Sequence, residues 1–226
     1  MKFTCMQKKF LEAILTVQNA VSGRSSMPIL EGILIETKKD VLKLVGTDLE
    51  LGIEHHIEAN ILQEGSIVIP ARLLSEIVRK LPDAEIEVSV LSNNSVKITC
   101  LNSIVTLQGF APDEYPSLPD IDENQPIEIS KLLLIDMIRE TIFAVAVDEA
   151  RPILTGALSL RKGVMDTPHE SVRVIIPGKS LAEIGKIIPE DDRQVSITVS
   201  ERHVLFDLGY TRIISRVLEG EYINYT

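Results

Sequence analysis

Residues 69–82 read IPARLLSEIVRKLP, and residues 176–189 read IPGKSLAEIGKIIP. The two stretches correspond position by position at a constant offset in residue number, from the opening Ile-Pro to the closing Pro. In each stretch a proline stands where a helix can begin, and apolar residues then recur at the spacing of one helix face. A self-similarity of this length indicates a repeated structural unit. The chain is therefore predicted to contain two copies of one fold.

A different offset relates the beginnings of the two copies. Residues 28–34 read PILEGIL, and residues 152–158 read PILTGAL, an offset of 124 in residue number. The apolar residue Phe10 corresponds to Leu134 at the same offset. The later match, from position 69 to position 176, has an offset of only 107. The two offsets differ by 17. The second copy is therefore predicted to lack 17 residues relative to the first, between positions 158 and 177.

Each copy is predicted to be an α+β domain, in which two helices pack on antiparallel sheet. Apolar residues at helix spacing predict a first helix around Phe10, Ile14, Val17 and Val21, and a second helix follows Pro70. The remaining segments of the first copy are short and rich in β-branched residues, as is typical of strands. These predicted strands are residues 41–45, 53–59, 66–69, 86–90, 96–100 and 104–108.

A stretch rich in proline and acidic residues, residues 112–126, separates the two copies. Such a composition is typical of a linker. The predicted boundary lies near Asp120. It gives a first domain of residues 1–119 and a second, internally shortened domain of residues 120–226.

The composition is acidic, with 33 acidic and 23 basic side chains among 226 residues and a net charge of -10. This balance argues against a protein that coats nucleic acid with its whole surface, but it leaves room for a local basic face. The apolar segments are too short to cross a membrane, and the N-terminus lacks the apolar core of a secretory signal, so a cytoplasmic protein is expected. Cys5 and Cys100 are expected to be reduced thiols, and neither a metal site nor a cofactor is predicted.

Candidate catalytic residues are few. Asp48 and Glu50 lie two residues apart at the end of a strand and could act as a general acid and base, but solvated acidic residues in turns are far commoner. His55 and His56 are adjacent on a predicted strand, so they are expected to point to opposite faces and not to share a metal ion. The sequence contains no phosphate-binding glycine loop and no hydrolase motif. A hydrolase is therefore the weakest of the functions considered.

Both copies of the second helix carry a net positive charge in a chain that is net negative. Arg72 corresponds to Lys179 and Arg79 corresponds to Lys186, while Lys80 adds a further cation to the first copy. One explanation is a solvated helix face with intrahelical ion pairs. The other is a repeated cationic face for a polyanion.

Two arginines near the Pro-Ile-Leu turns are a weaker case. Arg24 and Arg151 each lie close to that turn in their copy, but not at equivalent positions. An ordinary solvated loop explains each of them separately, and a shared edge that faces a polyanion is the alternative.

Several short motifs are specific when they are taken together. They are MKFT at residues 1–4, GR at 23–24, PIL at 28–30, GTDLE at 46–50, IPAR at 69–72, DEYP at 113–116 and RPIL at 151–154. Over essentially the whole chain they resemble the bacterial DNA polymerase III β subunit family, the sliding clamps. The resemblance implies a ring of repeated domains whose helices line a central hole. It also implies a task without catalysis, which is to encircle double-stranded DNA without sequence specificity and to tether the replicative polymerase.

The resemblance further implies site residues and partners. Basic positions at or near the DNA-facing side of the family are matched by Arg24, Arg72, Arg151 and Lys179, and the helix pattern adds Arg79, Lys80 and Lys186. The implied partners are polymerase and clamp-loader subunits, which bind through short peptides, and further copies in a homo-oligomeric ring. Leu154 matches the peptide pocket of the family, and Ile223 stands where a proline is common.

Two departures from the family bear on the function. The resemblance covers two of the three family domains, and the third domain closes the ring against a second subunit. The gap in the second copy falls where the family has a strand pair and a turn that walls the peptide pocket. The alternative hypothesis is therefore a truncated clamp paralogue, a protein-interaction module that does not encircle DNA.

Overall fold

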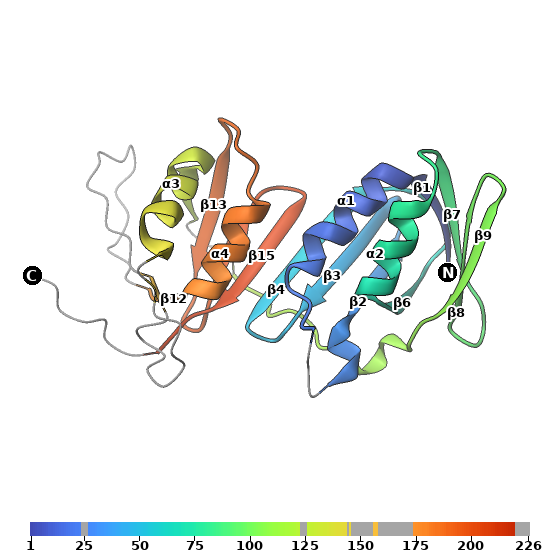
Figure 1. Ribbon diagram of the computed structural model, residues 1–226. Helices are drawn as coiled ribbons and strands as arrows, with labels where there is room; N and C mark the ends of the chain where they lie inside the picture. The colour runs from blue at the N-terminus through green and yellow to red at the C-terminus, as the bar shows by residue number, and fades with distance from the viewer. Residues whose placement is uncertain (24–26, 123–125, 144, 146–155, 158–173, 220–226) are drawn as a thin grey trace, which may run out of the picture. The chain divides into compact units, whose positions relative to one another are not determined.

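The computed structural model describes residues 1–23, 27–122, 126–143, 145, 156–157 and 174–219 (Figure 1). Contacts within the chain define two compact units, Met1–Leu118 and Pro119–Thr226. The division falls inside the proline-rich, acidic stretch of the sequence.

The first unit contains helices α1 (Gln7–Gln18) and α2 (Ala71–Lys80) and short 3-10 helices η1 (Pro28–Glu31) and η2 (Pro112–Glu114). Its strands are β1 (Lys2–Met6), β2 (Gly32–Lys38), β3 (Val41–Thr47), β4 (Leu51–Glu58), β5 (Asn60–Gln63), β6 (Gly65–Pro70), β7 (Glu85–Val90), β8 (Ser95–Cys100) and β9 (Ser103–Gln108). One antiparallel group pairs in the order β5-β1-β7-β8-β9, and another in the order β4-β3-β2-β6. All six strands predicted for this copy are present.

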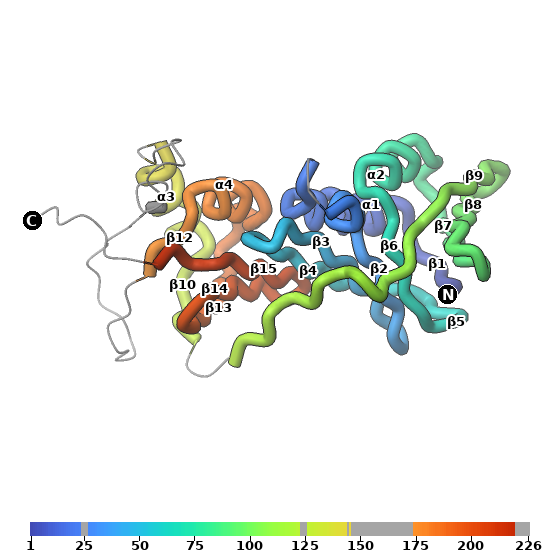
Figure 2. Tube along the Cα trace, turned by 90° about the horizontal axis from the view of Figure 1, so that it is seen from below, coloured from blue at the N-terminus to red at the C-terminus, as the bar shows by residue number. Residues whose placement is uncertain are grey.

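The two helices lie side by side on one face of β2, β3, β4 and β6 (Figures 1 and 2). Phe10, Ile14 and Val17 are completely buried, as predicted, whereas Val21, which was predicted on the same face, lies beyond the end of α1 and is only partly buried. The helix α2 buries Leu74 and Val78 in the same layer. The apolar faces of both helices are thereby used in the core, and their polar faces remain available for other contacts.

The helix α1 comes very close to β3 at one position. A Cβ atom on Gly46 would lie 2.3 Å from the carbonyl oxygen of Val17, near the C-terminal end of α1. A Cβ atom at that distance would overlap the carbonyl oxygen, which can move only if the backbone of α1 moves. This close approach therefore requires glycine.

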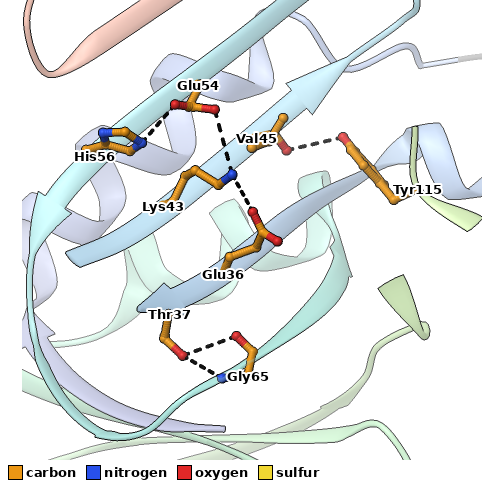
Figure 3. A network of polar contacts seen from close by, with 8 residues as sticks. All are labelled: Glu36, Thr37, Lys43, Val45, Glu54, His56, Gly65 and Tyr115. Atoms are coloured by element: carbon orange, nitrogen blue, oxygen red, sulfur yellow. Dashed lines mark hydrogen bonds and ion pairs between the residues drawn. The ribbon is translucent and has the colours of Figure 1, made fainter. Parts of the chain in front are cut away.

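The segment that follows β9 crosses the sheet on the face opposite the helices. Phe110 and Val68 exchange backbone hydrogen bonds of 2.8 and 3.1 Å. Further along, Tyr115 is buried, and its hydroxyl oxygen lies 3.2 Å from the carbonyl oxygens of both Gly32 and Val45 (Figure 3). Side chains alternate along β3, so the side chain of Val45 points away from α1. The segment is thus attached to the sheet at two points before the second unit begins.

The second unit contains helices α3 (Lys131–Ile142) and α4 (Gly178–Ile187), which pack side by side (Figure 1). Its described strands are β10 (Ile127–Ser130), β11 (Gly156–Ala157), β12 (Ile176–Pro177), β13 (Gln194–Val199), β14 (His203–Asp207) and β15 (Thr211–Arg216). Strands β10, β13, β14 and β15 pair in that order, as β1, β7, β8 and β9 do in the first unit. The helix starts, Gln7 with Lys131 and Ala71 with Gly178, differ by the two predicted offsets and confirm both.

The shortening of the second copy is visible where β11 pairs with β12. Gly156 pairs with Pro177, and the equivalent residues Gly32 and Pro70 pair in the first unit. Only residues 157–176 intervene in the second unit, against residues 33–69 in the first. The two connections differ in length by 17 residues, which is the size of the predicted shortfall.

The predicted alignment of the strand after the second helix is wrong by two positions. Continued beyond the second helix, the offset of 107 aligns Val88 with Val195. In the structure, Cys5 pairs with Ile86 on β7, whereas the equivalent residue Ile129 pairs with Val195 on β13. The true counterpart of Val195 is therefore Ile86, because the loop before β13 is longer by two positions. Side chains of a strand alternate with a period of two, so the shifted alignment kept the same buried pattern.

Candidate nucleic-acid interface

The second helix of each unit begins with a cation and without a stabilising side chain. The helix α2 follows Pro70 and α4 follows Pro177, and neither has a side-chain cap or an acidic residue in its first turn. The second residue of each helix is Arg72 or Lys179. Since the N-terminus of a helix carries partial positive charge, a cation there is unfavourable for helix stability. Each of these helices therefore carries a cation in its first turn that does not stabilise the helix, which favours a role in contacting anions.

In α2 the cations form one exposed stripe. Arg72 and Arg79 are seven residues apart, or about two helical turns, so they lie on the same side of the helix. The side chain of Arg72 is 90% exposed, and its Nε lies 3.1 Å from Oε1 of Glu76. Arg79 and Lys80 are exposed in the last turn. Within the residues that the structure describes, neither of these two side chains forms an ion pair.

The helix α4 repeats this stripe with lysines. Lys179 and Lys186 are also seven residues apart, and both are exposed. Nζ of Lys186 lies 2.8 Å from Oε1 of Glu183. The equivalent of Lys80 is Ile187, so α4 carries one cation fewer than α2.

The structure therefore groups the predicted cations on two helices. Arg72, Arg79 and Lys80 come together on α2, and Lys179 and Lys186 on α4. The other predicted site residues lie outside the described residues; they are Arg24, Arg151, Leu154 and Ile223. Long, exposed cations on a helix surface suit contacts with phosphate oxygens, which carry no information about base sequence.

Asp48 and Glu50 do not form an acid–base pair. Oδ1 of Asp48 accepts hydrogen bonds from the backbone N–H groups of Glu50 at 3.1 Å and Leu51 at 2.8 Å. Asp48 thereby closes the turn between β3 and β4, in which Leu49 has a φ of 76°. This local role is the usual one for an aspartate in a turn and accounts for the residue without catalysis.

His56 belongs to a network of polar contacts across the outer face of β2, β3 and β4 (Figure 3). Its Nε2 lies 2.9 Å from Oε1 of Glu54, and Nζ of Lys43 lies 2.5 Å from Oε2 of Glu36 and 3.8 Å from Oε2 of Glu54. His55 points to the other face of β4, where burial lowers its pKa. In the described part of the chain, no three His, Cys, Asp or Glu side chains are grouped so that they could hold a metal ion.

Cys5 and Cys100 are buried free thiols, as expected. Burial, followed by the nearby charge of Glu85, raises the pKa of Cys5 to about 12. The Cys5 thiol therefore stays protonated and is not a nucleophile. Among the described residues, no helix has the length and apolar character needed to span a membrane.

Sequence reasoning missed a buried lysine. Lys131, the first residue of α3, is 1% exposed, and its Nζ lies 3.3 Å from Oδ1 of Asp191. Asp191 lies in the longer loop before β13 and also accepts a 2.6 Å hydrogen bond from Nη2 of Arg193. At the equivalent position of the first unit, Nε2 of Gln7 donates to the carbonyl oxygen of Val78 at 2.7 Å. Two features of the sequence could have indicated this pair. One is a lysine at the position equivalent to Gln7, and the other is the two-residue insertion in the loop before β13.

Comparisons with known proteins agree with the two-unit fold. The family models for the N-terminal and central domains of the DNA polymerase III beta subunit match residues 1–119 and 157–224. The beta sliding clamp of Bacillus subtilis (strain 168) is 38% identical over 253 residues, which cover 100% of this chain and 67% of that protein. The crystal structure of a DNA polymerase sliding clamp from Bacillus subtilis has a TM-score of 0.96 at 38% identity and covers 100% of this chain and 67% of that one. The beta subunit from the DNA polymerase of Streptococcus pyogenes has a TM-score of 0.93 at 28% identity and covers 99% of this chain and 66% of that one.

Two α+β units that match the beta subunit family models place the chain in the class of DNA clamp proteins. The chain belongs to the DNA polymerase III beta subunit family, the beta sliding clamps. It spans about two thirds of the length of the relatives that it matches. The alignment with the Bacillus subtilis relative is longer than the chain itself, so that relative contains residues with no counterpart here.

Proposed function

We propose that the protein is a DNA polymerase processivity factor, a sliding clamp that encircles duplex DNA and tethers the replicative polymerase. The observation that carries the proposal is the stripe of exposed cations repeated on α2 and α4 in a member of this family. A clamp that slides needs contacts with phosphates and none with bases. The net charge of -10 is compatible with this role, since an acidic remainder discourages binding of DNA elsewhere.

The proposed DNA-binding residues are Arg24, Arg72, Arg79, Lys80, Arg151, Lys179 and Lys186. The five on α2 and α4 are supported by their exposure and their repeated spacing. Arg24 and Arg151 are supported by the family motifs around them alone. The protein is proposed to be a non-catalytic subunit of the polymerase holoenzyme, and no residue is assigned a catalytic role.

The domains and partners follow from the same proposal. Residues 1–119 and 120–226 form two clamp domains, and further copies complete the ring. Polymerase and clamp-loader subunits bind through short peptides, for which Leu154 and Ile223 are the candidate contacts. The site of action is the bacterial cytoplasm, where the chromosome is replicated.

Retention on circular DNA tests the proposal. The chain is loaded with a clamp loader onto nicked circular duplex, and the retained protein is measured before and after the DNA is linearised. We expect retention on the circle and loss from the linear form, since topological linkage ends at open DNA ends. Arg72→Glu with Lys179→Glu is expected to reduce retention equally on unrelated sequences, because phosphate contacts carry no base information. Lys97→Glu, an exposed position on β8, serves as the control with the same kind of charge reversal.

The shortfall in the second unit favours a second candidate function. In this candidate, a truncated clamp paralogue binds protein partners without encircling DNA. Partner binding with no preference for circular over linear DNA would support this candidate and contradict the first.

A further inference from the structure

A carboxylate is repeated between the cations of both stripes. Glu76 lies four residues after Arg72 and three residues before Arg79 on α2. Glu183 has the same place between the two lysines of α4 and is the repeat equivalent of Glu76. Residues three and four apart are neighbours on a helix surface, so each carboxylate can reach either cation of its stripe.

The two carboxylates pair with opposite ends of their stripes. Glu76 binds the N-terminal cation Arg72, with 3.1 Å between Oε1 and Nε. Glu183 binds the C-terminal cation Lys186, with 2.8 Å between Oε1 and Nζ. The carboxylate therefore has the same position on both helices, but it pairs with the N-terminal cation on α2 and with the C-terminal cation on α4.

Helix stability gives a poor account of the Arg72–Glu76 pair. In the Arg72–Glu76 pair the cation precedes the acid, which is the weaker orientation on a helix. The first turns, where a carboxylate would complement the helix dipole, contain no acidic residue in either α2 or α4. Arg72 and Glu76 are 90% and 52% exposed, and such exposed pairs add little to stability.

We propose that Glu76 and Glu183 compete with DNA phosphates for the cations beside them. Each carboxylate holds one cation while no phosphate is near, releases it to a phosphate, and takes it back when the phosphate leaves. The competition weakens each contact with the DNA backbone, so that the clamp stays bound by many weak contacts and still moves along the duplex. This inference rests on the proposed function and assigns a property of the same surface.

The salt dependence of DNA binding tests this proposal. Glu76→Gln, Glu183→Gln and the double variant are compared with the unmodified chain on a labelled duplex of about 20 base pairs across a salt titration. We expect about two- to fivefold tighter binding per substitution at low salt. The slope of log affinity against log salt should steepen by just under one for each added phosphate contact. Glu114→Gln and Glu201→Gln are the controls, since each removes one exposed carboxylate that lies outside the two helices.

Each result decides the proposal. Tighter binding in the helix variants alone supports it, as does a Glu76→Gln effect that falls by half or more when Arg72 is first replaced by Gln. Equal changes in the control variants would show that only the total charge matters and would overturn it. If the unmodified chain binds DNA and the helix variants bind no more tightly, the inference fails and the proposed function stands. If neither the unmodified chain nor the variants bind this open-ended duplex at low salt, the inference fails, while retention on circular DNA still decides the proposed function.

Discussion

At the scale of single residues, one position shows how the two units differ. Gln7 and Lys131 both begin the first helix of their unit and are both buried. An amide can be satisfied by one carbonyl group, but a buried ammonium requires a counter-ion. The longer loop before β13 supplies Asp191 for this purpose. The sequence could not predict the pair, because Lys131 and Asp191 are far apart in the chain. The two-residue insertion also escaped notice, because a shift of two positions leaves the alternating pattern of a strand unchanged.

The protonation of Asp191 should control the stability of the second unit in acid. Hydrogen bonds from Arg193, followed by those from Lys131, lower the pKa of Asp191 to about 2. An unfolded aspartate has a pKa of about 3.9, so the stabilising effect is complete above that pH and is lost as the pH falls towards 2. Urea denaturation followed between pH about 6 and about 2 should show this loss. Asp191→Asn should lower stability near neutral pH and flatten the profile in that window.

The neighbouring exposed residue provides the control for this experiment. Asp192→Asn removes one carboxylate from the same loop without touching Lys131. A pH profile of Asp191→Asn that matched both the control and the unmodified chain would contradict the assigned role.

Tyr115 provides a second prediction at this scale. Its hydroxyl is buried beside two carbonyl oxygens, and burial raises the pKa of Tyr115, so the phenol keeps its proton and remains a donor. Tyr115→Phe should lower the free energy of unfolding of the first unit by about 1–2 kcal/mol, because an acceptor loses its partner. Equilibrium urea denaturation measures the change. The same substitution at Tyr210, which lies in the second unit and is 69% exposed, should change the free energy of unfolding of that unit by less than about 0.5 kcal/mol.

At the scale of elements, the sequence predicted both helices and six strands of the first unit, because their apolar periodicity was clear. The strands β1, β2 and β5 were not predicted. The pattern of β2 was obscured by the turn that precedes it, and β5 is an edge strand of only four mostly exposed residues, too short to show a period. The sequence predicted cations on the second helices and offered intrahelical ion pairs as one explanation of them, and the structure shows one such pair on each helix.

The contact between α1 and β3 makes Gly46 sensitive to substitution. Gly46→Ala places a Cβ atom against the carbonyl oxygen of Val17, so the helix must move away from the sheet. We expect a loss of about 1–3 kcal/mol in the free energy of unfolding, as in other overpacked cores. Thermal and urea denaturation measure this loss. Gly23→Ala is the matched control, since a Cβ there meets nothing within 4 Å; equal effects of the two substitutions would contradict the prediction.

At the scale of the whole molecule, the internal repeat predicted the architecture. Its two offsets located both helices of both units, and their difference gave the shorter connection in the second unit. The two units nevertheless differ in the strands near their helices. In the first unit α1 and α2 cover β2, β3, β4 and β6. In the second, α3 packs on β10, and α4 packs on the very short β11 and β12.

This difference predicts unequal stability. Amide hydrogens of β13, β14 and β15 should exchange faster than those of their counterparts β7, β8 and β9, since local opening is easier where fewer apolar contacts are buried. Hydrogen–deuterium exchange of the whole chain, read by mass spectrometry of peptides, measures both sets at once. Equal protection of the two sets would mean that the shortfall costs the second unit no stability.

The pairing of Gly156 with Pro177 also bears on how such a chain can be altered. Gly156 and Pro177 pair in the same way as Gly32 and Pro70, so the connection between them starts and ends at equivalent residue pairs in both units. Closing the shorter connection costs about 0.5 kcal/mol less chain entropy than closing the longer one, which offsets part of the lost packing. Residues 33–69 could therefore replace residues 157–176 between Gly156 and Pro177. The first unit itself thus supplies a sequence with which the second unit can be lengthened.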